Sequence, residues 1–336
     1  MKTIAFFNNK GGVGKTSLVY HVAWMFGEMG IKVIAADLDP QANLSSMFLD
    51  EDRLEELWPD GDHSQSILGA IKPILRGLGD VQQPHVEEIA DNVGLVVGDL
   101  GLSTFEDKLS VSWPNCHNRD EAAFRTMSAF HRGLALAAEQ QGANIVLIDV
   151  GPNLGAINRS AIIASEFVVI PLAPDLFSVQ GLRNLGPALR DWRKTWSEMY
   201  AKNPNKELSL PKGRMQPVGY VTLQPVMRLD RPVKAYGRWM SRIPLTYREA
   251  VLDEATTSSV PFDNDPHSLA NLRHRQSLMP MAMEARKPMF FLKPADGAIG
   301  AHASAVNDCY WDFRRLATKI AERCGIPVPS KESQGA

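Results

Sequence analysis

The chain has 336 residues, of which 44% are hydrophobic and 22% charged, so it has enough apolar material for a sizeable folded core. Its 36 basic and 38 acidic residues give a net charge of −2, which excludes a global attraction to nucleic acid. Three scattered cysteines, Cys116, Cys309 and Cys324, argue against a disulfide framework or a zinc site. Because we find no apolar run of about 18 residues and no basic-then-apolar leader, we expect a cytoplasmic protein.

A glycine-rich loop over residues 8–17 follows the first predicted strand, residues 3–7, and precedes a predicted helix at 16–29. Its glycines allow successive backbone N–H groups to point into one concavity that suits phosphate oxygens. Lys15 can reach terminal phosphates, and the Thr16 hydroxyl can bind Mg²⁺. A second lysine, Lys10, precedes the glycine pair, and Asn9 occupies the place of the usual first glycine. The predicted nucleotide-binding residues are Lys10, Gly11, Gly12, Val13, Gly14, Lys15, Thr16 and Ser17.

Two further apolar stretches end in acidic residues. The stretch at 31–36 leads into Asp37 and Asp39, which are two apart and so point the same way in a strand. The stretch at 144–149 ends in Asp149. Ligands of open α/β sheets bind at the carboxyl ends of the strands, where one carboxylate can hold hydrated Mg²⁺ and another can orient a water. We therefore take Thr16, Asp37 and Asp149 as candidate metal-binding residues.

The remaining patterns alternate between strands and helices. They predict strands at 93–97, 167–172 and 217–223, and helices at 121–140, 155–164, 178–200 and 308–323. Such alternation indicates an α/β fold, with a mainly parallel twisted sheet covered by helices on both faces.

Two of the expected helices carry basic stripes that could neutralise DNA phosphates without reading sequence. The stripes consist of Arg183, Arg190 and Lys194 on the first helix, and Arg315, Lys319 and Arg323 on the second. A solvated helix face is the commoner explanation for either stripe alone. The last helix also has an apolar face, but its residues serve equally well in a core, so a membrane partner is not expected.

Together these motifs resemble those of the ParA/MinD family of ATPases. Residues 10–16 are similar to the family's deviant Walker A loop, 37–43 to its Walker A′ element, and 148–149 with Pro152 to its Walker B strand. The run Asp-Pro-Gln-Ala-Asn at 39–43 is closer to the ParA plasmid and chromosome partition branch than to MinD. Gly151 stands where the family often has a proline, which favours a more mobile loop.

The resemblance implies a P-loop ATPase that binds ATP with Mg²⁺ and closes into a homodimer. Lys10 would reach the partner's nucleotide in trans, like an arginine finger, and Lys15 would hold the β- and γ-phosphates. Thr16 and, through water, Asp149 would hold Mg²⁺, while Asp39 would position the attacking water and Asp37 would support the site. The catalytic residues would therefore be Lys10, Lys15 and Asp39. Non-specific DNA and a ParB-like stimulatory protein are the implied partners.

The resemblance also bears on domain organisation and leaves alternatives open. We expect one elaborated domain over residues 1–325, with insertions at about 51–143 and 245–275, and a flexible tail at 326–336. A positioning or regulatory ATPase that acts on a non-DNA cargo or a membrane surface remains an alternative. A metabolic P-loop kinase or ligase is disfavoured by the doubled lysine and the Asp-Pro-Gln-Ala-Asn run.

Overall fold

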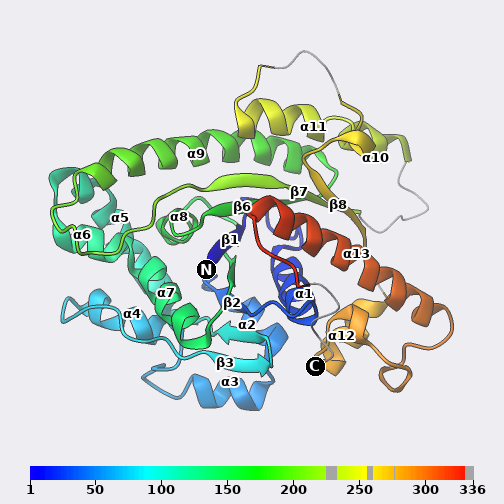
Figure 1. The fold of residues 1–336 in the computed structure, drawn as a ribbon, viewed down its shortest axis with the longest axis horizontal. Helices are drawn as coiled ribbons and strands as arrows, with labels where there is room; N and C mark the ends of the chain where they lie inside the picture. Colours follow the sequence, from blue (N-terminus) through cyan, green and yellow to red (C-terminus); the bar gives the residue numbers. More distant parts are fainter. Residues whose placement is uncertain (225–232, 256–259, 276, 330–336) are drawn as a thin grey trace.

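The computed structural model describes residues 1–224, 233–255, 260–275 and 277–329. In this part of the chain, one eight-stranded sheet has the order β3-β4-β2-β5-β1-β6-β7-β8 (Figure 1). Neighbouring strands are parallel except for β3 and β4, which are antiparallel. The strands are β1 (Lys2–Phe6), β2 (Val33–Asp37), β3 (Glu87–Ala90), β4 (Val93–Val96), β5 (Ile145–Asp149), β6 (Phe167–Leu172), β7 (Gln216–Gln224) and β8 (Ser268–Arg273).

Helices cover both faces of this sheet, so the predicted fold class is confirmed. Alternate residues of each central strand contribute to two apolar cores, one on each face. One face is covered by α4 (Ile67–Arg76), α5 (Phe105–Asn115), α6 (Glu121–Met127), α7 (Ala129–Gln141), α8 (Ala156–Ile163), α9 (Leu176–Ala201) and α11 (Ile243–Thr246). The other is covered by α1 (Lys15–Glu28), α2 (Asn43–Phe48), α3 (Glu51–Leu57), α12 (Leu278–Ala285) and α13 (Ala301–Cys324). Every residue of β2, β5 and β6 is buried, as double coverage of a parallel sheet requires.

Several elements differ from their predicted bounds. The helix predicted at 121–140 is two helices, because the chain leaves helical geometry at Ser128, whose hydroxyl donates to the Phe124 carbonyl. The last helix is longer than predicted and starts at Ala301. β8 was not predicted, since only Leu269 and Leu272 of its residues are buried and its apolar pattern is short. The 51–143 segment contributes β3 and β4 to the sheet, and the 245–275 segment contributes β8.

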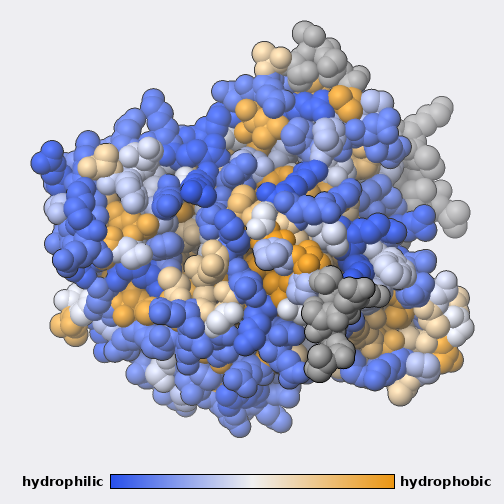
Figure 2. Space-filling view, in the orientation of Figure 1, coloured by the Kyte–Doolittle hydropathy of each residue, from blue (hydrophilic) through white to orange (hydrophobic). Residues whose placement is uncertain are grey.

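The remaining described elements are short. They are α10 (Val233–Met240), the 3₁₀ turns η1 (Leu100–Thr104), η2 (Cys116–Asn118), η4 (Phe262–Asn264), η5 (Met289–Phe291) and η6 (Pro294–Asp296), and the π turn η3 (Tyr247–Leu252). From residue 330 onward, the predicted flexible tail lies outside the described residues. No described helix combines the length and apolarity that a bilayer crossing requires. The face seen in Figure 2 is mostly hydrophilic, with apolar side chains in scattered patches.

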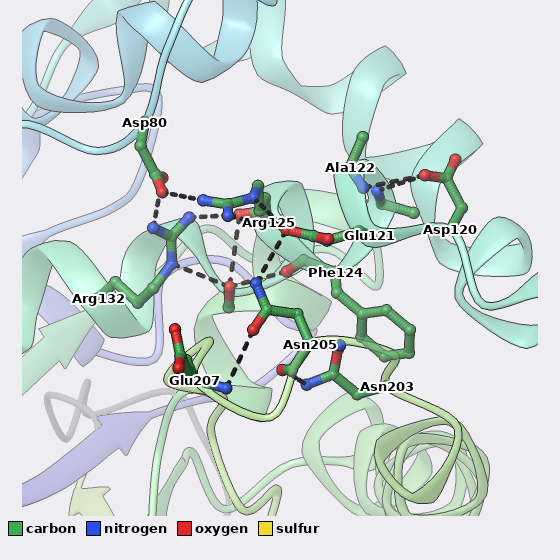
Figure 3. Close-up of polar contacts among 12 residues, drawn as sticks. Asp80, Asp120, Glu121, Ala122, Phe124, Arg125, Arg132, Asn203, Asn205 and Glu207 are labelled. Atoms are coloured by element: carbon green, nitrogen blue, oxygen red, sulfur yellow. Dashed lines mark hydrogen bonds and ion pairs between the residues drawn. The ribbon is translucent and has the colours of Figure 1, made fainter.

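An ion-pair network joins separate segments on the α6–α7 side of the molecule (Figure 3). Asp80, in the chain after α4, binds both Arg125 of α6 and Arg132 of α7. Glu121 accepts from Arg125 Nη2 at 2.8 Å and from Asn205 Nδ2 at 3.0 Å. The arginine network, as we call these five residues, therefore ties the segment before β3 and the chain between α9 and β7 to the same pair of helices.

Candidate nucleotide-binding site

The predicted acidic residues meet at one edge of the sheet. Asp37, the last residue of β2, is directly opposite Asp149, the last residue of β5, and Phe6 of β1 is opposite Asp149 on its other side. β1 continues into the glycine-rich loop, which therefore starts at the same edge. The parallel order thus brings the loop and the acidic strand ends together, as expected from sequence.

The loop has the conformation that its glycines permit. Gly12 and Gly14 have φ angles of 70° and 74°, in the left-handed region that favours glycine. A Cβ atom at Gly14 would lie 2.3 Å from Leu223 Cδ1, so a side chain would clash there with the end of β7. α1 begins at Lys15, directly after this turn, which directs its N-terminal N–H groups toward the loop.

Lys15 is buried beside the acidic strand ends. Its side-chain Nζ donates to the Lys10 carbonyl at 3.3 Å, and the residue is 7% exposed. Burial lowers the pKa of Lys15, and the nearby charges of Asp149 and Asp39 partly offset that effect. The ammonium group is therefore largely shielded from bulk water and lies near the charges of Asp149 and Asp39.

Asp149 differs from Asp37 and Asp39 in the hydrogen bonding of its carboxyl group. It is fully buried, and neither of its carboxylate oxygens meets hydrogen-bond geometry with any described residue. Burial raises the pKa of Asp149 well above its usual range, and the neighbouring Asp37 raises it further, whereas the Thr16 hydroxyl and Lys15 lower it. Two free carboxylate oxygens next to a threonine hydroxyl are hard ligands of the kind that Mg²⁺ prefers.

Asp37 is buried as deeply but is hydrogen-bonded. Its Oδ2 accepts from the backbone N and the hydroxyl of Ser45, both at 2.8 Å, and its Oδ1 accepts from Asp39 N at 3.3 Å. Burial raises the pKa of Asp37 to about 7 in spite of these bonds. Ser45 in turn accepts from Gly98 N at 2.8 Å, so Asp37 joins β2 to α2 and to the end of β4. Its role as a metal ligand stays a prediction.

The donor set suits Mg²⁺ better than a dedicated all-protein metal site. The described residues hold no group of three or more His, Cys, Asp or Glu side chains that could bind a metal ion. Mg²⁺ commonly uses one or two carboxylates together with waters and substrate phosphates. Asp149 and Thr16 beside a phosphate loop fit that pattern.

The loop after β5 is fixed by side chains from two helices. Asn158 Nδ2 donates to the Gly151 carbonyl at 2.8 Å and to the Asn153 carbonyl at 2.7 Å. Glu106 of α5 accepts from the N–H groups of Ala156 and Ile157, at 2.6 and 2.8 Å, and so caps α8. These bonds hold the loop although it has glycine in place of proline. Sequence reasoning missed Glu106, because only the fold brings α5 to this helix start.

Asp39 lies near the loop after β5, and Lys10 lies near the start of α9. Asp39 is 6% exposed and accepts from Gln41 N at 3.0 Å, and a Cβ atom at Gly151 would lie 3.2 Å from its Oδ1. Lys10 forms an ion pair with Asp175, the residue that caps α9, and its ammonium lies 5.8 Å from the centre of the Phe177 ring. Nothing in the sequence pattern around Lys10 indicated this partner.

A cavity of about 420 Å³ adjoins the phosphate loop. The exposed surface of its walls is mostly apolar, and the polar lining residues are Ser17, Gln224, Arg273, His274, Arg275 and Asp312. An apolar cavity with a few polar groups beside a phosphate site suits a nucleobase. The apolar lining includes Leu18, Leu223, Leu272, Met279, Met289 and Phe313, which come from α1, the ends of β7 and β8, α12, η5 and α13. Several of these residues stand out in the sequence as apolar, but no pattern there assigns them to a cavity beside the phosphate loop.

The two basic stripes lie on opposite faces of the sheet, since α9 and α13 belong to different cores (Figure 1). Arg190 donates to the Ala250 carbonyl and pairs with Asp253 at 3.3 Å. Arg323 donates to the carbonyls of Val218, at 2.6 Å, and Pro266. Both arginines therefore bind the protein itself. The other four stripe residues, Arg183, Lys194, Arg315 and Lys319, are exposed, and of these Arg315 also donates to Asp312 Oδ1 at 2.7 Å.

Residues 1–201 match the family model described as an AAA domain. The chain is similar to the protein IncC from Escherichia coli, at 29% identity over 194 residues, which is 58% of this chain and 47% of IncC. It is also similar to the virulence plasmid ParA family protein pGP5-D from Chlamydia psittaci, at 27% identity over 186 residues, which is 55% of this chain and 62% of that protein. The chain thus spans about half to two thirds of the length of these curated relatives.

Solved structures share the whole fold. McdA from Cyanothece in complex with ATP has a TM-score of 0.63 at 15% identity, covering 98% of this chain and 99% of McdA. A plasmid partition protein from Borrelia burgdorferi has a TM-score of 0.54 at 15% identity, covering 96% and 99%. Identities this low show the fold alone. With the family model and the curated relatives, the chain belongs to the AAA-domain family and, within it, to the ParA/MinD ATPases of the partition branch.

Proposed function

We propose that this protein hydrolyses ATP as a dimerisation switch and that the switch drives DNA partitioning. The observation that carries the proposal is the meeting of the phosphate loop with the free carboxylate of Asp149 at one sheet edge. A buried carboxylate without a hydrogen-bond partner is costly, and a site that keeps one is a candidate for ligand binding. The names of the relatives support a role in partition, and the ATP complex of McdA supports binding of ATP.

In this proposal each side chain has one task. Backbone N–H groups of the loop and Lys15 bind the phosphates, and Thr16 and Asp149 hold Mg²⁺. When bound, Mg²⁺ would neutralise the charge that develops on the phosphate oxygens. Asp39 orients the attacking water, and Glu106 and Asn158 keep the neighbouring loop in place. Asp37 holds the end of β2 against α2.

A second copy of the chain completes the site. Leu154, Leu176 and Phe177 follow β5 and β6 at the carboxyl edge, and they are 38%, 51% and 70% exposed. Exposed apolar side chains around a binding site favour a protein partner, and a two-fold pair would use the same surface on both copies. Lys10 lies beside Phe177 and would contribute its charge to the nucleotide of the facing protomer.

The DNA contact of the proposed switch would use exposed basic side chains on one of two helices. Exposed Arg183 and Lys194 on α9, or Arg315 and Lys319 on α13, would bind phosphates non-specifically. A ParB-like protein would accelerate hydrolysis. The bonds of Arg190 and Arg323 to their own protein favour the second candidate, a positioning or regulatory ATPase with a cargo other than DNA.

Solution mass tests the switch. We expect a dimer with ATP and a monomer with ADP, and we expect Asp39→Ala to prolong the ATP dimer because hydrolysis is slowed. A mass that is independent of nucleotide would refute the switch. Lys10→Ala should bind ATP normally and lose turnover, whereas normal turnover would refute the trans role of Lys10.

Retention on random DNA separates the two candidates. We expect ATP-dependent binding that weakens as salt rises. The double variants Arg183→Ala/Lys194→Ala and Arg315→Ala/Lys319→Ala can be compared, because each removes two exposed basic side chains from one face of the sheet. The second variant also removes the ion pair of Arg315 with Asp312. Loss of retention in one pair identifies the DNA face. No retention of the wild type at low salt with ATP would favour the non-DNA cargo.

A further inference from the structure

The ion pair of Lys10 with Asp175 joins the phosphate loop to the start of α9. Lys10 comes from the loop after β1, and Asp175 is the last residue before the longest helix in the described chain. The two side chains are 25% and 39% exposed, so the pair lies at the rim of the site rather than in the core. Lys10 thus has a partner on its own protomer.

The backbone at Lys10 is fixed, so only its side chain is free to move. The Lys10 N–H donates to Asn8 Oδ1 at 3.0 Å, and Asn8 Nδ2 donates to the Pro171 carbonyl at 2.6 Å, which ties the loop to β6. The Lys10 carbonyl accepts from Lys15 Nζ at 3.3 Å. A change of partner for the ammonium group therefore requires rotation of the side chain and no rearrangement of the loop.

We propose that Asp175 is a positioning residue that holds Lys10 on its own protomer until the nucleotide of a second protomer draws the lysine away. The inference rests on the proposed function, because it needs Lys10 to act in trans. A partly exposed ion pair is weak, whereas a triphosphate offers a lysine several charged oxygens. Transfer of Lys10 from Asp175 to a nucleotide is therefore favourable only when a nucleotide-loaded second protomer is present. In a lone protomer, Lys10 stays paired with Asp175.

The exchange also couples the site to α9. Asp175 Oδ1 accepts from Ser178 N at 2.8 Å and caps the helix, while Oδ2 binds Lys10. The first turns of α9 lie against the loop, since a Cβ atom at Gly181 would be 3.0 Å from Asn9 Oδ1. When Lys10 leaves, the cap keeps its bond to Ser178 and loses its counter-charge. The electrostatic environment at the start of α9 thus depends on whether Lys10 binds Asp175 or the nucleotide of a second protomer.

The substitution Asp175→Asn separates the two roles of this residue, which pairs with Lys10 and caps α9. Asparagine is as good an N-cap as aspartate, so α9 keeps its cap while the ion pair with Lys10 is lost. We expect ATP turnover without a stimulating protein, and the ATP-dependent dimer fraction at limiting protein concentration, to rise about two- to fivefold. Asp191→Asn is the matched control, because Asp191 is an exposed carboxylate further along α9. Unchanged or reduced turnover in Asp175→Asn, in a protein whose wild type needs Lys10, would overturn the proposal.

A second measurement does not depend on hydrolysis. Acetylation of Lys10 by a small amine-reactive reagent, followed by peptide mass spectrometry on nucleotide-free protein, reports how firmly the ammonium is held. We expect faster labelling of Lys10 in Asp175→Asn than in wild type or Asp191→Asn. Equal labelling in all three would overturn the holding role. If Lys10→Ala keeps normal turnover, the trans role in the proposed function fails, and the labelling result alone then decides whether Asp175 holds the lysine.

Discussion

Asp37 and Asp149 lie side by side at the ends of β2 and β5, whereas Asp80 and Glu121 lie among arginines on the α6–α7 side (Figure 3). At the strand ends, burial raises the pKa of both carboxyl groups. In the arginine network, burial alone would raise the pKa of Asp80, but bonds from Arg132 and the Val81 N–H, with the arginine charges, outweigh it and lower the pKa. The ionised form of the carboxyl group is therefore disfavoured at the strand ends and favoured in the arginine network.

The difference follows from what each region has available. In the arginine network, arginine side chains pair with the carboxylates. These charges therefore contribute to folding stability, and the carboxylates do not need a ligand as a partner. The strand ends have Lys15 as the cation next to Asp149 and Asp39, and two oxygens of Asp149 stay free. Binding of a metal and phosphates is therefore favourable at this site, because these ligands supply the partners that the carboxylate oxygens of Asp149 lack. The comparison predicts that substitutions in the first region change ligand affinity and those in the second change stability.

The largest effect is expected from Lys15→Met, which removes the charge but keeps much of the volume of the side chain. ATP affinity should fall by about 100-fold or more, because removing one partner of a buried charge pair between protein and ligand costs about 2–5 kcal/mol of binding free energy. Calorimetric titration with ATP and Mg²⁺ measures this change. An affinity within tenfold of wild type would contradict the assignment of Lys15 to the phosphates.

Arg132→Met is the matched change in the other region. The Arg132 side chain is 12% exposed and binds Asp80, the Ser128 hydroxyl and the Arg125 carbonyl. We expect the free energy of unfolding in urea to fall by about 1–3 kcal/mol, the usual cost of losing charged hydrogen bonds. ATP affinity should stay within twofold of wild type. A large loss of affinity here would remove the distinction between the two regions.

Asp149→Asn should separate stability from binding within the site itself. Replacing an unpartnered buried carboxyl group by a neutral amide should stabilise the nucleotide-free protein by about 1 kcal/mol. Mg²⁺-dependent tightening of ATP binding should be lost, because an amide is a poor substitute for the carboxylate. Urea unfolding and ATP titration with and without Mg²⁺ measure the two effects. A destabilised variant with intact Mg²⁺ dependence would mean that Asp149 is structural.

Much of the strand-end region could be predicted from sequence, since its information is local. The glycines and lysines of the loop are contiguous, and parallel strands that end in Asp37 and Asp149 place those residues at one edge by geometry alone. The fold class followed in the same way from alternating apolar patterns.

What could not be predicted depends on contacts between distant segments. Lys10 and Asp175 are 165 residues apart, and Glu106 meets α8 only because α5 packs there. The cavity lining from Leu272, Met279 and Phe313 is formed by elements whose apolar residues serve equally well in any core. The arginine network could not be predicted either, because nothing in the sequence around Arg132 of α7 indicates Asp80 as its partner.

The smallest expected effect is the pH dependence of the arginine network. The folded protein lowers the pKa of Asp80 below its usual value of 3.8, so the unfolded chain binds the proton more readily. The stabilisation from Asp80 is therefore complete above that value and is lost as the pH falls below it. Because Asp80 is 39% exposed, we discount the interaction for solvent screening and expect less than ~1 kcal/mol.

Asp80→Asn and wild type should then differ in unfolding free energy at pH 7 and converge as the pH falls toward 3. Urea unfolding at pH 7, 5, 4 and 3 measures the difference, and Asp60→Asn, at an exposed carboxylate, serves as the control. A difference that stayed constant with pH would mean that Asp80 acts through packing and not through its charge. Convergence at acid pH, by contrast, would mean that the negative charge of Asp80 stabilises the fold, because protonation neutralises the carboxylate that Arg125 and Arg132 bind.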